Sequence, residues 1–296
     1  MKWIDKCLGS LRSSSVKIYP VIVDNNSQDE TVTYIKHHYP EVYLIQNNNN
    51  KGFGQANNQG IEYAYKQGAT HFFLLNQDAF VQEDTIEKLI NIQDKYNLAL
   101  VSPIHLNGNG DLLDYNYFSQ TVLIENNIEY VSDLILNRTK PYYSVFKINA
   151  AAWMLSRKTI EQIGGFDPLY FHYGEDGNYC QRIKYHKGEV VFVPEAYIHH
   201  DRIRQGNIEI YKKNATLMML LFLYSDINYS VWKIDKNRIK LHLANCNLAL
   251  SYLFRFKFKE FGNLCCSYIK FIGKLPKMLN NMKLNKQIGP NWLHLN

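Results

Sequence analysis

The alternation of short apolar runs with stretches of helical periodicity, through residues 1–208, constrains the fold of this chain more than any other feature. The apolar runs occupy residues 19–23, 42–45, 71–75, 98–101, 150–155 and 190–193. Helical periodicity occupies residues 3–11, 29–38, 55–67, 85–96 and 158–163. Such an alternation predicts an α/β fold in which a mixed, mainly parallel sheet is flanked by helices.

After residue 208 the pattern is helical almost to the end, so we predict a first domain over residues 1–208 and a helical region over residues 209–296. The charge divides in a similar way. Residues 225–296 carry twelve Lys and Arg against three acidic residues, a local charge of +9. Because the net charge of the chain is +6, its first 224 residues carry −3. A mildly acidic domain followed by a strongly basic region is therefore expected.

The basic region mixes aromatic side chains with cations, most densely over residues 252–259 and 268–274. Such a mixture is typical of an amphipathic segment that binds the interface of an anionic membrane. Peripheral membrane contact is one hypothesis for this C-terminal region, and the solvated face of a helical subdomain or a homodimer contact is the alternative. A nucleic-acid partner is not expected, because the basic residues belong to no recognisable binding module.

The cysteines and the apolar runs bear on where the protein works. The five cysteines are odd in number and lack metal-ligand spacing, which favours free thiols in a reducing compartment. Residues 1–12 lack the apolar core of a signal peptide. The longest apolar run, residues 217–224, is less than half of the roughly 20 residues that a spanning helix needs. We expect a cytoplasmic protein, at the inner face of the plasma membrane if its basic region binds lipid.

Two acidic residues lie just after predicted strands. Asp24 comes after residues 21–23, and Asp78 comes after residues 72–75 with two polar residues between. In open α/β sheets, ligands bind beyond the carboxyl ends of the strands. A carboxylate at such a place needs a partner, such as a metal ion or a hydrogen-bond donor on a ligand. The alternative for Asp24 is a turn or a helix N-cap.

Two further clusters carry groups suited to catalysis. Glu175 and Asp176 lie in a loop after the aromatic stretch 170–173, and paired carboxylates in such a loop suit general-base work because burial and a neighbouring like charge raise a carboxylate's pKa. The alternative is a helix N-terminus whose dipole the two acids complement. His199 and His200 come after the strand at residues 190–193 and Pro194. One of these histidines could bind a metal ion there.

Several segments resemble motifs of family 2 glycosyltransferases, especially of the rhamnosyltransferase-like branch. They are residues 23–29 (Val-Asp-Asn-Asn-Ser-Gln-Asp), residues 49–60 (Asn-Asn-Lys-Gly-Phe-Gly-Gln-Ala-Asn-Asn-Gln-Gly), residues 75–79 (Leu-Asn-Gln-Asp-Ala), Gly165-Phe166-Asp167 with Tyr173-Gly174-Glu175-Asp176, and residues 194–200, which end in His. Arg182 falls where the family's following helix carries Arg. One such motif is a weak signal, but five in the family's order over about 180 residues are specific.

The resemblance implies a GT-A fold with a helical C-terminal extension, and a hexosyltransferase that moves a sugar, with inversion, from a nucleotide diphosphate to an acceptor hydroxyl in bacterial surface polysaccharide synthesis. Asp176 would be the general base, with Glu175 beside it. Asp78 and His200 would hold Mg²⁺ or Mn²⁺ against the diphosphate, since hard oxygen ligands suit these ions. The donor would be held by Asp24, Asn26, Gly52, Asn58 and Asn76. The acceptor would be a saccharide, for which a lipid-linked one fits the basic region.

Two departures from the family pattern stand out. The family opens with a strand of the type Val-Ser-Ile-Ile-Val-x-Tyr-Asn, whereas residues 1–3 lead directly into the helix that should follow it. We therefore expect the first strand to be missing, which would expose sheet edges and remove one wall of the nucleotide pocket. Asn76 replaces the first acid of the family's Asp-x-Asp motif, and its amide oxygen is the weaker ligand.

Two other functions compete with this interpretation. A nucleotidyltransferase should carry a Gly-rich start with a phosphate-binding Lys or Arg, and the first residues show neither. A non-catalytic remnant that binds a nucleotide or a sugar is favoured by the missing first strand. The complete set of candidate site residues argues against a remnant; it consists of Asp24, Asp78, Glu175, Asp176 and His200.

Overall fold

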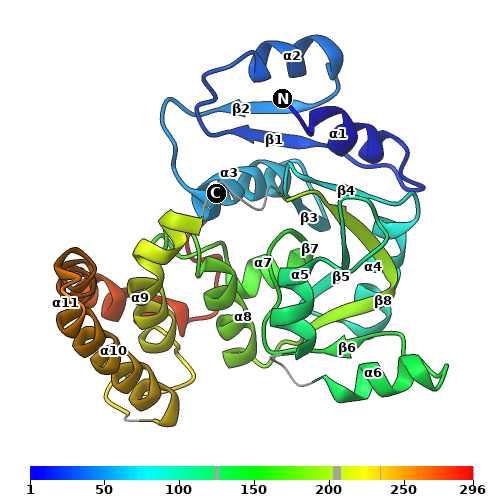
Figure 1. The fold of residues 1–296 in the computed structure, drawn as a ribbon. Helices are drawn as coiled ribbons and strands as arrows, with labels where there is room; N and C mark the ends of the chain where they lie inside the picture. The colour runs from blue at the N-terminus through cyan, green and yellow to red at the C-terminus, as the bar shows by residue number, and fades with distance from the viewer. Residues whose placement is uncertain (124–126, 203–207, 234, 296) are drawn as a thin grey trace. The chain divides into compact units, whose positions relative to one another are not determined.

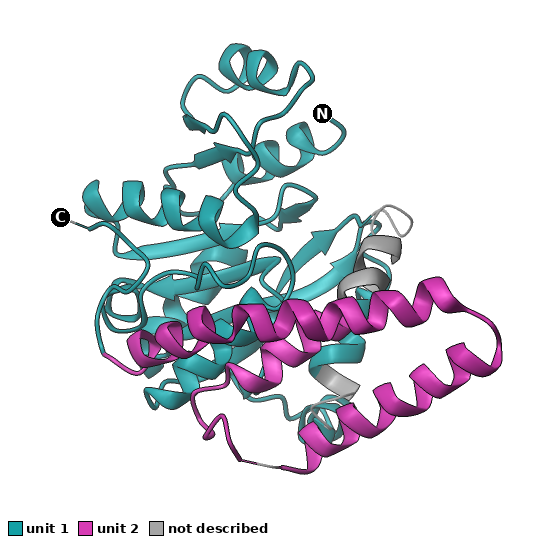
Figure 2. Ribbon diagram, turned by 90° about the vertical axis from the view of Figure 1, so that its left-hand side faces the viewer, with its two compact units in different colours: residues 1–202, 288–296 teal, residues 203–287 magenta. Residues whose placement is uncertain are grey.

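A computed structural model describes residues 1–123, 127–202, 208–233 and 235–295, with the backbone alone for residues 122, 123 and 208–214. The chain divides into two compact units. The first comprises residues 1–202 together with 288–296, and the second comprises residues 203–287 (Figure 2). The last nine residues, which follow the helical region in sequence, thus belong to the first unit.

The main sheet of the first unit has six strands in the order β3-β7-β5-β8-β4, with β6 paired to β8 (Figure 1). The strands are β3 (His71–Leu75), β4 (Ala79–Val81), β5 (Leu100–Asn107), β6 (Tyr143–Ser144), β7 (Ala152–Ser156) and β8 (Val190–His200). β5 and β8 are parallel, and the other ladders of this sheet are antiparallel. Because β7 lies antiparallel between β3 and β5, the strands β3, β5 and β8 all run in one direction. Their carboxyl ends therefore lie at the same edge of the sheet.

The sheet is mixed, as expected, but with less parallel pairing than the alternation predicted. The reason is β7, the predicted buried strand, which returns from an irregular stretch and inserts between two strands of the same direction. Its side chains alternate between two cores: Trp153 and Leu155 belong to one, and Ala152 and Met154 to the other. A strand that is buried on both faces has a continuous apolar sequence. This is why the apolar run at residues 150–155 correctly predicted β7.

Helices cover the sheet and connect its strands. They are α3 (Phe53–Lys66), α4 (Thr85–Tyr96), α5 (Tyr115–Tyr117), α6 (Ile128–Ile135), α7 (Arg157–Ile163) and α8 (Glu175–Tyr185), with a π-helical turn at Phe118–Leu123. The fully buried rings of Trp153, Phe166 and Tyr179 join β7 to the segment before α8 and to α8 itself, with centroid distances of 5.1 to 6.0 Å. This aromatic cluster fixes α8 against the sheet.

β8 extends well beyond the predicted strand at residues 190–193. Its register with β5 shifts between Pro103, which pairs with Val193, and Ile104, which pairs with Tyr197. The ladder skips residues 194–196 of β8, which begin with Pro194, a residue that has no N–H to donate. Pairing resumes after these residues, and this carries the strand on to His200 at the carboxyl edge.

A second, two-stranded sheet lies earlier in the chain. β1 (Val21–Asp24) pairs in parallel with β2 (Tyr43–Gln46). The helices α1 (Ile4–Arg12) and α2 (Thr31–His38) accompany it, with Ile4, Leu8, Ile35 and Tyr39 forming a small buried cluster. Within the described residues β1 is paired to β2 alone and β3 to β7 alone, so each keeps one edge without a ladder.

The second unit is helical. It contains α9 (Ile208–Tyr224), α10 (Lys236–Phe254) and α11 (Phe258–Asn285), and Figure 2 shows α10 and α11 as a long antiparallel hairpin. The guanidinium of Arg238, at the start of α10, donates to the carbonyls of Leu223, Ser230, Val231 and Lys233. This buried arginine orders the connection from α9 to α10. None of the helices in the described ranges combines the length and apolarity needed to cross a bilayer.

Candidate active site

The carboxyl edge of the main sheet brings Asp78 and His200 together. Asp78 follows β3, and the short strand β4 then pairs with the end of β8 so that Ala79 lies opposite His200. The Nε2 atom of His200 lies 3.3 Å from Oδ1 of Asp78. The His200 side chain is 2% exposed and that of Asp78 is 23% exposed, so the carboxylate is the part of the pair that solvent reaches. Two residues 122 positions apart in sequence thus form one site.

His199 points the other way. Successive side chains of a strand face opposite sides of the sheet, and the His199 ring stacks on Phe80 with centroids 4.7 Å apart. Burial lowers its pKa. Gly110 leaves room for the ring, because a Cβ at that position would lie 2.2 Å from Cε1 of His199. Of the two adjacent histidines, His200 is therefore the one beside Asp78.

Two residues that the sequence did not single out stand behind His200. Nε of Arg202 lies 3.1 Å from Oδ2 of Asp114 and donates to Nδ1 of His200 at 3.2 Å. Oδ2 of Asp114 is itself 3.9 Å from Nδ1 of His200. Asp114 is buried, and its Oδ1 caps α5 by accepting from the backbone N–H of Tyr117 at 2.8 Å. The cap anchors the carboxylate, so the imidazole of His200 is held from behind by a fixed acid and its arginine.

Asp24 ends β1 and is buried, with 8% of its surface exposed. Both of its carboxylate oxygens accept from the backbone N–H of Ser27, at 3.3 and 3.1 Å. This is the turn that was the alternative for Asp24, and it leaves further lone pairs of the carboxylate for a ligand. Asn26 lies within this turn, exposed and with a φ of 74°.

An amide network ties the turn after β1 to the loop after β2. The Asn47 amide donates to Oδ1 of Asn25 at 3.1 Å and to Oε1 of Gln59 at 2.8 Å. Asn25 in turn donates to the carbonyl of Gly52 at 3.2 Å. The Asn-rich sequence of these loops is therefore used mainly to hold them against each other.

Gly52 makes a close contact that excludes any side chain. Its φ is 82°, and a Cβ there would lie 2.1 Å from the carbonyl oxygen of Phe171. The next residue, Phe53, donates its backbone N–H to that same carbonyl at 3.2 Å. Gly52 thus lets the loop before α3 approach the aromatic stretch that leads to Glu175 and Asp176.

Asn58 is buried in α3 and is engaged on both sides of its amide. Its Oδ1 accepts from the Phe166 N–H at 2.7 Å, and its Nδ2 donates to the Phe166 carbonyl at 2.9 Å. Nδ2 also donates to the carbonyl of Trp292 at 3.3 Å. The amide therefore holds the Gly-Phe-Asp segment instead of facing solvent. Asn76, by contrast, is partly exposed just before Asp78, and its backbone N–H donates to the Ala151 carbonyl at 2.9 Å.

Glu175 and Asp176 begin α8 after Gly174, whose φ is 95°. Because α8 is followed by β8 after a short turn, its N-terminus lies toward the carboxyl edge of the sheet. Glu175 is 6% exposed, and burial raises its pKa to about 8, with the charge of Asp176 as the next cause. The Asp176 side chain is 21% exposed and its Oδ1 lies 3.9 Å from Nζ of Lys147. The two acids thus divide into a buried one and an accessible one.

Arg182, nearly two helical turns further along α8, holds the segment at the end of α7. It is 1% exposed, and its guanidinium donates to the carbonyls of Gly165 and Ile163. Burial lowers its pKa. These hydrogen bonds fix the glycine pair between α7 and α8, so the arginine has a structural reason to occupy this position.

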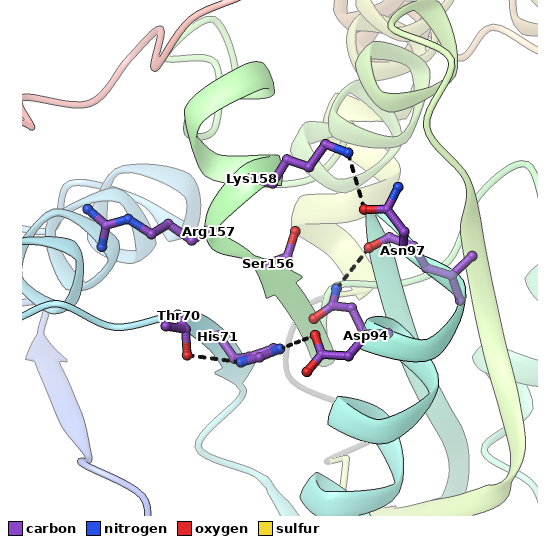
Figure 3. A pocket seen from close by; sticks show the side chains of 9 residues that line it. Thr70, His71, Asp94, Asn97, Ser156, Arg157 and Lys158 are labelled. Carbon is purple, nitrogen blue, oxygen red and sulfur yellow. Dashed lines mark hydrogen bonds and ion pairs between the residues drawn. The ribbon is translucent and has the colours of Figure 1, made fainter.

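A cavity of about 250 Å³ lies at the opposite, amino edge of the sheet (Figure 3). It is lined where β3 begins and β7 ends, and charged side chains in its lining have partners: Nε2 of His71 lies 2.9 Å from Oδ1 of Asp94, and Nζ of Lys158 donates to Oδ1 of Asn97 at 3.1 Å. Ligands of open α/β sheets bind at the carboxyl ends. The candidate site is therefore the Asp78 and His200 edge, not this cavity.

Residues 2–164 match the sequence model of the family described as Glycosyl transferase family 2. The match covers more than half of the chain, so the protein belongs to glycosyl transferase family 2. Asp24 and Asp78 lie inside the matched range, whereas Glu175, Asp176 and His200 lie beyond it.

Three characterised relatives are similar to this chain. The low-salt glycan biosynthesis hexosyltransferase Agl10 of Haloferax volcanii is 24% identical over 165 residues, which are 55% of this chain and 52% of the relative. The dTDP-rhamnosyl transferase RfbF of Shigella flexneri is 24% identical over 226 residues, 76% of this chain and 74% of the relative. The rhamnosyltransferase WbbL of Escherichia coli is 26% identical over 215 residues, 67% of this chain and 80% of the relative. The similarity thus spans about half of the Haloferax protein and most of the other two.

Two solved structures share the fold. The structure of GalNAc-T7 with UDP, GalNAc and Mn²⁺ superposes with a TM-score of 0.54 at 16% identity, over 81% of this chain and 52% of that one. Residues 1–349 of S. aureus TarS superpose with a TM-score of 0.54 at 14% identity, over 94% of this chain and 77% of that one. With the family match, these similarities confirm the predicted GT-A-like α/β fold, a central mixed sheet flanked by helices.

Proposed function

We propose that this family 2 glycosyltransferase is an inverting, metal-dependent hexosyltransferase that moves a sugar from a nucleotide diphosphate to an acceptor hydroxyl in surface polysaccharide synthesis. The observation that carries the proposal is the Asp78 and His200 pair at the carboxyl edge, 3.3 Å apart and fixed from behind by Asp114 and Arg202. The relatives named as hexosyl- and rhamnosyltransferases support the class of sugar.

The pair fits a divalent cation only with help from the substrate. The described residues contain no group of three or more His, Cys, Asp or Glu side chains that could hold a metal ion. Mg²⁺ is usually bound by one or two carboxylates together with substrate phosphates and water, and Mn²⁺ accepts similar ligands. Asp78 and His200 would hold the ion when the donor diphosphate is present. The ion would supply charge neutralisation for the departing nucleotide diphosphate.

Asp176 serves as the general base in this proposal. It accepts the proton of the acceptor hydroxyl while the acceptor oxygen forms a bond to the anomeric carbon and the bond from that carbon to the diphosphate breaks. Of the two acids Asp176 is the one that solvent reaches, as a base must be. Glu175, whose pKa is raised to about 8, retains its proton near neutral pH and adds no second negative charge.

The donor-binding residues divide into those with free polar groups and those that position others. Asp24 would accept from the nucleotide base with the lone pairs that Ser27 leaves. The exposed side chain of Asn26 and the partly exposed one of Asn76 would line the same site. Gly52 allows the close approach to Phe171. Asn58 positions the Phe166 segment and does not itself contact the donor in this proposal, because both ends of its amide bind the Phe166 backbone.

The test is thermal stability against a panel of nucleoside diphosphates, each with and without Mn²⁺. A ligand that binds only the folded state stabilises it and so raises the melting temperature. At a ligand concentration of a hundred times the dissociation constant, the free energy of unfolding increases by about 2.7 kcal/mol. We expect a shift with one base that grows when Mn²⁺ is added and that Asp78→Ala removes. If no nucleotide shifts the melting temperature, the chain is a non-catalytic remnant of the fold. A nucleotidyltransferase would instead respond to nucleoside triphosphates.

A further inference from the structure

The turn between α10 and α11 concentrates exposed aromatic rings and cations. We call residues 253–259 the hairpin tip; every one of them is exposed. Phe254, Phe256 and Phe258 are 82%, 79% and 62% exposed. Three cations, Arg255, Lys257 and Lys259, alternate with them in the sequence. Three exposed phenylalanine rings within five residues are an apolar concentration of the kind that marks an interaction surface.

The backbone of the tip indicates that folding stability alone did not select these residues. The N–H of Lys257 donates to the carbonyl of Tyr252 at 2.8 Å, and that of Phe256 donates to the carbonyl of Leu253 at 3.1 Å. This is the Schellman arrangement that ends a helix, in which the left-handed position normally holds Gly or Asn. Here that position, with a φ of 55°, holds Phe256. A bulky ring at a place suited to glycine is unfavourable for the fold.

We infer that the hairpin tip inserts its phenylalanine rings into the interface of an anionic lipid surface, with its cations on the lipid phosphates. Aromatic side chains next to Lys and Arg are what interfacial segments use, because the rings enter the acyl boundary while the cations stay with anionic headgroups. Since no described helix could span a bilayer, the contact would be peripheral. The inference concerns the second unit alone and does not depend on the proposed catalytic role.

The charges of the tip favour lipid over a second copy of this chain. An isologous contact between two copies would bring the cations of both tips together, and like charges that face each other repel. The one acidic residue next to the tip is Glu260, so little negative charge is available to offset them. Phe also lacks the polar group that Tyr and Trp bring to protein interfaces.

The experiment is co-sedimentation of the full-length protein with vesicles of phosphatidylcholine alone or mixed with phosphatidylglycerol, at low and high salt. We expect binding to the anionic vesicles that weakens with salt, because exposed charges are screened. The combined variant Arg255→Gln, Lys257→Gln, Lys259→Gln should bind about 100-fold more weakly, at roughly five-fold per cation. Tyr19→Ser removes an exposed aromatic ring that also has a lysine beside it, in the first unit, and should bind like the unchanged protein.

Phe256→Gly separates binding from folding. Glycine suits the left-handed position, so the variant should melt at the same temperature as the unchanged protein or higher, while its binding to anionic vesicles falls several-fold. The inference is overturned if the unchanged protein ignores anionic vesicles at low salt, or if Phe256→Gly and the combined Phe254→Ser, Phe258→Ser variant bind as well as it does. A tip variant that changes the oligomeric state in sedimentation velocity without changing vesicle binding would mean that the tip joins two copies, and would also overturn it.

Discussion

Two His–Asp pairs of the first unit, His71–Asp94 and His200–Asp78, lie at opposite edges of the same sheet, and the shorter one lies at the amino edge. Nε2 of His71 is 2.9 Å from Oδ1 of Asp94, whereas Nε2 of His200 is 3.3 Å from Oδ1 of Asp78. The Asp94 side chain is 63% exposed, and an exposed ion pair is worth at most about 1 kcal/mol. The distance within a pair therefore says little about its function.

The surroundings of the two pairs differ more than the pairs do. His71 has the hydroxyl of Thr70 at 3.1 Å from its second ring nitrogen, and its pair lines a cavity whose other charged groups have partners (Figure 3). His200 is almost fully buried and has Asp114 and Arg202 behind it. Asp114 and Arg202 fix the orientation of the ring, and Asp114 is the acceptor that an Nδ1–H of His200 would need if Nε2 bound an ion. The layer behind the ring and the edge of the sheet are the reasons why we propose the site at Asp78 and His200.

The largest effect should come from removing the carboxylate of one pair and then of the other. Asp78→Ala should lower kcat/KM for sugar transfer by about 10³-fold or more, because it removes a proposed ligand of the metal ion. That ion would stabilise the charge that develops in the transition state by several kcal/mol. Asp94→Ala should change kcat/KM less than two-fold and stability by less than about 1 kcal/mol. Initial rates with the donor identified by thermal shift would measure both. Equal losses from the two variants would remove the distinction between the edges.

Asp176→Asn should separate chemistry from binding at the carboxyl edge. The amide keeps the shape of the side chain but cannot accept the proton, so kcat should fall by about 10³-fold, in the range that a general base contributes. The Mn²⁺-dependent thermal shift with the nucleoside diphosphate should be unchanged. If the shift were lost together with the activity, Asp176 would belong to the donor site and another residue would be the base.

Part of this site could be predicted from the sequence. Asp78 follows the apolar run at residues 71–75 after two polar residues, and His200 comes after the apolar run at residues 190–193, so the rule that ligands bind beyond strand ends pointed to both. The preference for His200 over His199 follows from the alternation of side chains along β8, once the register of that strand is known. The extension of β8 past Pro194 depends on an irregularity of the strand pairing that the periodicity of the sequence does not predict.

The remainder depends on contacts between distant parts of the chain. Asp114 lies in the stretch after residue 107, which has no regular pattern, and it meets His200 and Arg202 only because β5 and β8 are neighbours. The amide of Asn58 binds Phe166, 108 positions away, so a residue that fits a donor-binding motif serves to position another segment. The position of β7 between β3 and β5 likewise could not be predicted, because local β-propensity does not determine which strands pair.

A moderate effect is expected from the layer behind His200. Asp114→Asn should weaken Mn²⁺ affinity in the presence of nucleoside diphosphate by about 10- to 100-fold, as losses of outer residues at metal sites do. The matched change at the other pair, Thr70→Val, should leave that affinity unchanged. Calorimetric titration of Mn²⁺ would measure it without reference to turnover. An unchanged affinity in Asp114→Asn would mean that the Asp114–Arg202 pair serves only to cap α5.

Among the changes at the carboxyl edge, the smallest effect on activity should come from Glu175→Gln, which tests the second acid of α8. Near pH 7 Glu175 retains its proton, because burial raises its pKa from 4.5 to about 8, so the neutral amide should transfer sugar at a rate within about three-fold of the unchanged protein.

The free energy of unfolding should differ between the unchanged protein and Glu175→Gln, and the difference should depend on pH. The unfolded chain releases this proton near pH 4.5 and the folded one near pH 8, so the stability that protonated Glu175 contributes is complete below pH 4.5 and is lost as the pH rises to about 8. Gln cannot ionise, so across that window the variant should gain on the unchanged protein by at least about 1 kcal/mol, roughly 2–4 °C in Tm. Calorimetry from pH 5 to 8.5 would show a widening gap. Parallel curves would mean that Glu175 is charged in the folded protein, and that the buried and exposed acids of α8 share the base role.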